Sequence, residues 1–179
     1  MLQNQKVTEE TTARRSPAAW NNPQIDADFD NLRRWIVSRL NGTGGDRLEW
    51  RILLAEDDAA NRHVLTRLLE RSGVTVTAVE DGRKAVAAVT TGAFDMVLMD
   101  INMPEMDGLT ATRTIRGLGA EHGGLPIVAV TSEVSEADLT KMRAAGFDGC
   151  LEKPVRRDDL FRVILAALSP RLETAGGDD

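Results

Sequence analysis

The sequence has a single cysteine, few aromatic residues, no long apolar run and no excess of basic residues. One cysteine, Cys150, excludes an internal disulfide framework and indicates a reducing compartment. No apolar stretch approaches the roughly 20 residues needed to span a bilayer, and the amino terminus lacks the apolar core of a secretory signal. The net charge of −6 argues against broad nucleic-acid binding. These absences predict a soluble cytoplasmic protein without membrane or nucleic-acid partners.

The length suits one domain of ordinary size with extensions. The chain has 179 residues, and its 42% of hydrophobic residues suffice for one sizeable core. We predict a disordered segment over 1–20, an amphipathic helix with a Gly-rich linker over 21–48, a folded domain over 49–169 and a flexible tail over 170–179. The apolar stripe of this helix consists of Ile25, Phe29, Leu32, Ile36 and Leu40. A lone helix of this length is marginal in water, so the stripe is expected to pack on the folded domain, a second copy or a partner.

Within the folded domain, short apolar runs alternate with helical patterns. The predicted strands are Arg51–Ala55, Val74–Val79, Phe94–Met99, Pro126–Val130 and Phe147–Leu151. The predicted helices are Ala59–Arg71 (with Val64, Leu65, Leu68 and Leu69 inward), one after Gly82, one from Leu109 to Gly117, Glu136–Ala145 and Asp158–Leu168. Five strands alternating with five helices indicate an α/β fold, with a mainly parallel sheet covered on both faces.

Polar side chains follow several of these strands at their carboxyl ends. Asp100 comes directly after the buried run Met96–Met99, and a proline and an Asp-Gly pair then turn the chain away. The other strand-end groups are Glu56, Asp57 and Asp58 after the first strand, Thr131 and Ser132 after the fourth, and Lys153 after the fifth. Because the carboxyl ends of parallel strands lie at one edge of the sheet, we expect these groups to converge.

Carboxylates that converge in this way need a cation. Two carboxylates about 5 Å apart repel by roughly 3 kcal/mol at an effective dielectric constant of about 20. Oxygen ligands at this density suit Mg²⁺. With Lys153 as a second positive charge and Thr131 as a hydrogen-bond donor, the set fits phosphoryl transfer. Asp100 is then the expected nucleophile, which would become an aspartyl phosphate.

Four segments, ILLAEDDAAN, MVLMDINMPEMDG, IVAVTS and LEKP, occur in this order and carry a family resemblance. On these motifs, the chain resembles the receiver domain of two-component response regulators over about residues 51–169. The resemblance implies a flavodoxin-like (βα)5 doubly wound sheet with the strand order 2-1-3-4-5. It also implies that Asp100 is the phosphoacceptor, Thr131 the switch hydroxyl and Lys153 the lysine that pairs with the phosphate.

The resemblance extends to a cofactor. It implies Mg²⁺ organised by Glu56 and Asp57, with Asp57, Asp100 and the backbone carbonyl of Asn102 as direct ligands. It further implies that the peptide bond between Lys153 and its following proline is cis, an isomer found in about 5–6% of X–Pro bonds.

The implied function is that of a phosphoacceptor signalling protein and not of an enzyme with a separate substrate. A phosphohistidine on a histidine kinase or a histidine phosphotransfer protein would donate to Asp100, and the phosphorylated state would alter protein contacts. The chain would assist its own phosphorylation and dephosphorylation. A homodimer would form through the amino-terminal helix or through the face of the fourth helix, fifth strand and fifth helix. Two alternatives stay open: a pseudo-receiver that binds partners without phosphorylation, and an aspartyl-phosphate phosphatase.

Two positions depart from the usual family pattern. Cys150 stands where the family usually has tyrosine or phenylalanine, three residues before the lysine. A thiol fills less volume than an aromatic ring, so the usual coupling of Thr131 to an inward-moving ring is not expected here. Asp58 stands where many relatives have asparagine or another polar residue, and we interpret it as a helix cap.

Overall fold

The computed structural model describes residues 50–71 and 73–174, so the predicted disordered segment and amphipathic helix lie outside the described residues. The elements in chain order are β1 (Arg51–Ala55), α2 (Ala59–Glu70), β2 (Thr75–Val79), α3 (Gly82–Thr91), β3 (Met96–Asp100), α4 (Gly108–Arg116), α5 (Ala120–Gly123), β4 (Ile127–Thr131), α6 (Glu136–Ala145), β5 (Gly149–Glu152) and α7 (Arg157–Thr174). None of the helices in the described part of the chain has the length and apolar character needed to cross a bilayer.

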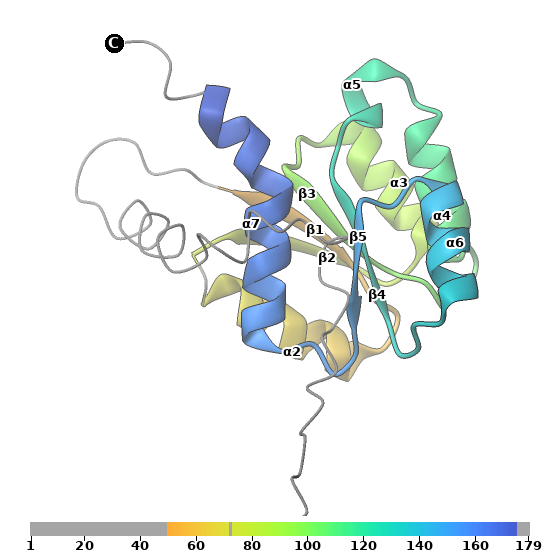
Figure 1. Ribbon diagram of the computed structural model, residues 1–179, viewed down its shortest axis with the longest axis horizontal. Helices are drawn as coiled ribbons and strands as arrows, with labels where there is room; N and C mark the ends of the chain where they lie inside the picture. The colour runs from red at the N-terminus through yellow and green to blue at the C-terminus, as the bar shows by residue number, and fades with distance from the viewer. Residues whose placement is uncertain (1–49, 72, 175–179) are drawn as a thin grey trace, which may run out of the picture.

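The strands form one parallel sheet with the order β2-β1-β3-β4-β5. This is the predicted doubly wound, flavodoxin-like arrangement. Figure 1 shows α2 and α7 on one face of the sheet and α3, α4 and α6 on the other. The connection from β1 leads to β2 on one side, and the connection from β2 leads back across β1 to β3 on the other side. The strand order therefore reverses next to β1, and this switch point opens at the carboxyl edge of the sheet.

The core has two halves, one on each face of the sheet, because alternate residues of a strand point to opposite faces. Along β1, Ile52 and Leu54 belong to the half with α2 and α7, whereas Leu53 and Ala55 belong to the half with α3, α4 and α6. All residues of β3 and β4 are buried, as expected for strands covered on both faces. Because helices pack on both faces of the sheet, the carboxyl ends of its strands are fixed relative to one another.

Side-chain caps start four helices. Asp58, Asp81, Asp107 and Ser135 each accept a hydrogen bond from the backbone N–H three residues later, at 2.8, 2.8, 2.6 and 3.2 Å respectively. Such a cap contributes about 1 kcal/mol. The cap interpretation of Asp58 is therefore confirmed.

Several element bounds shift by one or two residues from the sequence prediction, and three larger differences are found. Val64 was expected to face inward on α2, but its side chain is 62% exposed, because Leu65 and Leu69 already supply the buried face of this helix. The loop before β4 contains the short helix α5, which was not predicted because the segment is rich in glycine. The last helix continues past Leu168, where we expected its end, as far as Thr174. A single proline, Pro170, removes one backbone donor and does not end this helix.

Cys150 is fully buried in the half of the core formed with α3, α4 and α6. Burial, with a smaller contribution from Glu152, raises the pKa of its thiol to about 11.

We expect the native protein to react with a disulfide reagent at about pH 8 at least about a hundredfold more slowly than the unfolded chain. The reason is that little of the buried thiol is ionised to thiolate at this pH and that the reagent cannot reach it. Following release of the reagent's chromophore measures this, and rapid reaction of the native protein would contradict it. The raised pKa also implies that this thiol's contribution to stability is lost as the pH rises from about 9 to about 11.

Candidate functional site

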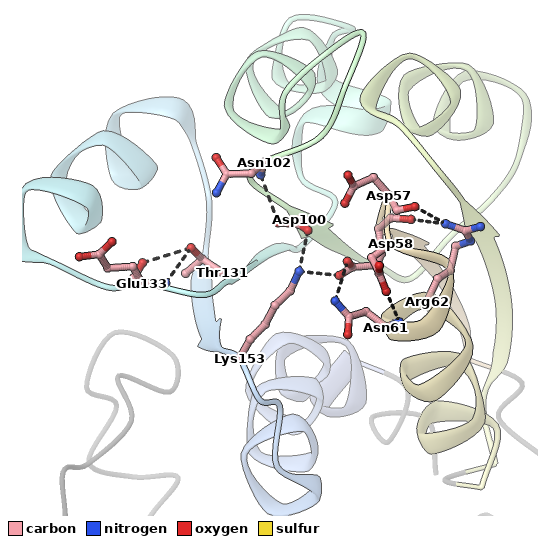
Figure 2. Close-up of polar contacts among 10 residues, drawn as sticks. Asp57, Asp58, Asn61, Arg62, Asp100, Asn102, Thr131, Glu133 and Lys153 are labelled. Atoms are coloured by element: carbon pink, nitrogen blue, oxygen red, sulfur yellow. Dashed lines mark hydrogen bonds and ion pairs between the residues drawn. The ribbon is translucent and has the colours of Figure 1, made fainter.

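The candidate site lies at the carboxyl edge of the sheet, where three strands deliver polar side chains. Glu56 and Asp57 follow β1, Asp100 is the last residue of β3, and Lys153 follows β5. The structure brings these four side chains together. Figure 2 shows Asp57, Asp100 and Lys153 facing the same edge of the sheet. Glu56 and Asp100 are only 1% and 4% exposed, so two carboxylates are held away from bulk water.

Lys153 is the internal counter-ion of this cluster. Its Nζ lies 2.6 Å from Asp100 Oδ2 and 2.8 Å from Glu56 Oε2. Burial acts to lower the pKa of Lys153, but the hydrogen bonds to Asp100 and Glu56 together outweigh burial and raise it. The lysine is therefore charged and partly buried. The peptide bond that follows it, Lys153–Pro154, is cis, as the resemblance implied.

The carboxylates meet the geometric requirement for a shared divalent ion. One oxygen each from Glu56, Asp57 and Asp100 lies within 4.8 Å of the other two. These are hard oxygen donors, which suit Mg²⁺, and the negative charges exceed what Lys153 alone can neutralise. The residues therefore fit the ion that the sequence predicts.

The position of Asp100 depends on the loop between β3 and α4. Asp100 Oδ1 accepts a hydrogen bond of 3.1 Å from the backbone N–H of Asn102. The N–H of Gly108, the first residue of α4, donates to the carbonyl of Ile101 at 2.9 Å. A Cβ at Gly108 would lie 2.1 Å from the backbone oxygen of Asp100, so only glycine permits this approach. In the sequence, Gly108 belongs to an Asp-Gly turn, and no local pattern indicates this packing.

Thr131 lies at the end of β4, one strand away from Asp100, and it is 4% exposed. Its hydroxyl donates to the backbone carbonyl of Glu133 at 3.1 Å, as drawn in Figure 2. Together with Asn102 and Met142 it lines an open cavity of about 180 Å3. The predicted switch hydroxyl thus borders the site without joining the cluster of Lys153.

The loop between β1 and α2 is held by two residues of α2. Asn61 Nδ2 lies 3.4 Å from Glu56 Oε1, and Arg62 Nη1 donates to the backbone carbonyls of Glu56 and Asp57 at 2.7 and 2.9 Å. No sequence pattern indicates the role of Arg62, because a helical arginine carries no local signal of a contact with the preceding loop.

Burial raises the pKa of Glu56 above its ordinary value, and the hydrogen bond from Lys153 opposes this only in part. The folded protein therefore binds this proton more tightly than the unfolded chain does, so the stability that the group contributes is lost as the pH rises through the folded-state pKa. We expect Glu56→Gln, without divalent metal, to raise Tm near neutral pH, because the amide avoids the cost of burying a charge. Thermal melts should show this gain shrinking as the pH falls below about 4, where the wild-type carboxyl becomes protonated in both the folded and the unfolded state. A lower Tm for the variant near neutral pH would contradict this view of Glu56.

Comparison with known proteins agrees with this geometry. The family described as the response regulator receiver domain matches residues 52–165. Transcription factor SKN7 from Saccharomyces cerevisiae is 36% identical over 132 residues, and the sensor protein GacS from Pseudomonas syringae pv. syringae is 43% identical over 117 residues. These alignments cover 74% and 64% of this chain but 21% and 13% of the relatives. The chain thus spans a small part of the length of these proteins.

Solved structures agree over nearly their whole length. The receiver domain of a sensor histidine kinase from Pseudomonas aeruginosa PAO1 is 35% identical, with a TM-score of 0.63 and coverage of 68% of this chain and 98% of that chain. That structure holds a magnesium ion coordinated in its active-site cleft. The chemotaxis protein CheY4 from Vibrio cholerae is 28% identical, with a TM-score of 0.64 and coverage of 67% and 99%.

Proposed function

Since the chain belongs to the response regulator receiver domains of two-component phosphorelay systems, we propose that its acidic cluster accepts a phosphoryl group on Asp100. The observation that carries this proposal is the meeting of Glu56, Asp57, Asp100 and Lys153 at one edge of the sheet. Receiver domains are signalling domains, and we propose that this one assists its own phosphorylation and dephosphorylation without a separate substrate. An aspartyl-phosphate phosphatase would carry its nucleophile after the first strand, whereas Asp100 ends the third.

In the proposed transfer, the bond between phosphorus and the imidazole nitrogen of a phosphohistidine breaks, and a bond forms between phosphorus and a carboxylate oxygen of Asp100. The imidazole nitrogen keeps the electron pair. Lys153, now paired with Asp100 Oδ2, is placed to exchange this contact for one with a phosphoryl oxygen. The Thr131 hydroxyl would exchange its bond to Glu133 for a bond to the phosphoryl group.

We propose that Glu56, Asp57 and Asp100 hold Mg²⁺, together with the backbone carbonyl of Asn102. Receiver domains bind Mg²⁺ at an acidic site, and the carboxylates here have the matching donor set. When bound, Mg²⁺ neutralises charge on the oxygens of the transferred group. Glu56 and Asp57 supply the negative charge that draws the ion to Asp100.

The partners that we propose are a histidine kinase and a histidine phosphotransfer protein, in keeping with the hybrid kinases among the relatives. The net charge of −6 favours protein partners over nucleic acid. A second copy is a further proposed partner, through the face of α6, β5 and α7 or through the amino-terminal segment. Because Cys150 replaces the usual aromatic ring, we propose that the loop after Thr131 carries the output, as its contacts with Glu133 must change when the hydroxyl moves.

Incubating the chain with acetyl phosphate tests this function. With Mg²⁺ present, intact mass spectrometry should show the addition of one phosphoryl group, and hydroxylamine should remove it because an acyl phosphate is labile. With a chelator in place of Mg²⁺, the modified fraction should fall at least about tenfold. A chain that binds Mg²⁺ yet gains no phosphoryl group, from acetyl phosphate or from a phosphorylated histidine phosphotransfer protein, would support the pseudo-receiver instead.

A further inference from the structure

Arg62, in the first turn of α2, is tied to the loop that carries the acidic pair. One nitrogen of its guanidinium, Nη1, donates to the carbonyl oxygens of both Glu56 and Asp57, at 2.7 and 2.9 Å. Figure 2 shows these bonds on the side of the loop away from Asp100 and Lys153. Hydrogen bonds from a charged donor are about twice as strong as those between neutral groups. The guanidinium therefore holds two successive peptide groups from behind.

The same loop is held at other points, so that the orientation of its side chains is set. The N–H of Glu56 donates to the carbonyl of Val79 on β2 at 3.1 Å. The carboxylate of Asp58 caps α2 on the N–H of Asn61 at 2.8 Å. With both carbonyls fixed by Arg62, the peptide planes before and after Asp57 cannot rotate freely. A more mobile loop would have to lose this freedom on binding an ion, at a cost in affinity.

We propose that Arg62 is a positioning residue for the divalent metal ion, which aligns the carboxylates of Glu56 and Asp57 through their backbone. This inference rests on the proposed function, since it concerns the Mg²⁺ of that site. Residues that orient metal ligands without touching the metal typically change metal affinity by about 10- to 100-fold when they are replaced. The charge of Arg62 has the opposite effect, because a positive group near the site repels a cation. Removing the arginine should therefore weaken Mg²⁺ binding if positioning dominates, and strengthen it if charge repulsion dominates.

The experiment compares Mg²⁺ affinity, measured by isothermal titration, in the wild-type chain and three variants. Arg62→Met removes the donors and the charge, and we expect its Kd to rise about tenfold. Arg62→Lys should stay within about threefold of wild type, because both bonds come from one nitrogen, which an ammonium group can imitate. Arg67→Met is the matched control: Arg67 lies on the same helix, is 67% exposed and pairs with Glu70 at 3.3 Å. It removes the same charge and should leave Kd within about twofold of wild type.

A spectroscopic readout without metal distinguishes positioning from general destabilisation. In Arg62→Met, the carbonyl 13C shifts of Glu56 and Asp57 should change, whereas in Arg67→Met they should stay as in wild type. Titrations are run well below the Tm of each variant. If Arg62→Met does not fold, Arg62→Gln takes its place with the same expected weakening, because its shorter neutral side chain lacks both the charge and the reach.

The outcomes separate the inference from the function on which it rests. An Arg62→Met protein that binds Mg²⁺ as tightly as wild type, or more tightly, overturns the positioning role. So does an equal loss of affinity in Arg67→Met, or a Kd for Arg62→Lys as weak as that of Arg62→Met. These results leave the proposed function intact as long as the wild-type chain binds Mg²⁺ and is phosphorylated. A wild-type chain that does not bind Mg²⁺ removes the proposed function and this inference together.

Discussion

Asp100→Asn should abolish phosphorylation by acetyl phosphate, with no modified protein detectable by intact mass spectrometry. The amide oxygen of asparagine is a far weaker nucleophile than the carboxylate. The variant should still fold, because asparagine has the same shape and its single side-chain oxygen can accept one of the two hydrogen bonds, from Lys153 or from the N–H of Asn102. Circular dichroism and thermal melts check the fold independently of the mass measurement.

Asp58→Asn is the matched control, since Asp58 lies next to the acidic pair and its side chain caps α2. Asparagine caps helices about as well as aspartate, so the cap should survive. We expect phosphorylation within about threefold of wild type, because the change removes only a nearby exposed charge. A phosphoryl group on Asp100→Asn would show that another residue is the acceptor. Loss of phosphorylation in Asp58→Asn would show that Asp58 takes part in the reaction.

Gly108→Ala should destabilise the domain by about 3 kcal/mol, which corresponds to a fall in Tm of roughly 10 °C. The added Cβ would meet the backbone oxygen of Asp100 at 2.1 Å, and neither backbone segment can move freely. The preference of helices for alanine over glycine, about 1 kcal/mol, offsets only part of this clash. Because the strand end that must shift carries the phosphoacceptor, phosphorylation should also slow measurably at temperatures where the variant is folded.

Gly124→Ala provides the comparison within the same chain. Gly124 follows α5, its φ is −91°, and a Cβ there would meet nothing within 4 Å. The change in Tm should be within about 2 °C, equivalent to about 0.5 kcal/mol. Equal melting temperatures for Gly108→Ala and wild type would show that the loop after β3 yields easily, contrary to the packing described above.

Much of the fold could be predicted from sequence because the strands are covered on both faces. Such strands appear as short apolar runs, and β1 was predicted with its observed bounds, Arg51–Ala55. Helix periodicity placed α6 equally well, at Glu136–Ala145. Helical periodicity was less informative about which residues of a helix are buried against the sheet. Val64 has helical spacing with Leu68 yet is exposed to solvent, because the buried face of α2 is centred on Leu65 and Leu69.

The amino-acid sequence alone determined which chemical groups stand at the strand ends: the acids after β1, Asp100 at the end of β3 and Lys153 after β5. Their gathering at one edge follows from parallel topology, which the alternation of patterns already implies. Only the tertiary structure decided that Lys153 bridges Glu56 and Asp100, that Arg62 holds the acidic loop from behind, and that Gly108 lies against the backbone of Asp100. These contacts depend on distances between segments far apart in the chain or on the direction of a loop, neither of which leaves a periodic signal in sequence.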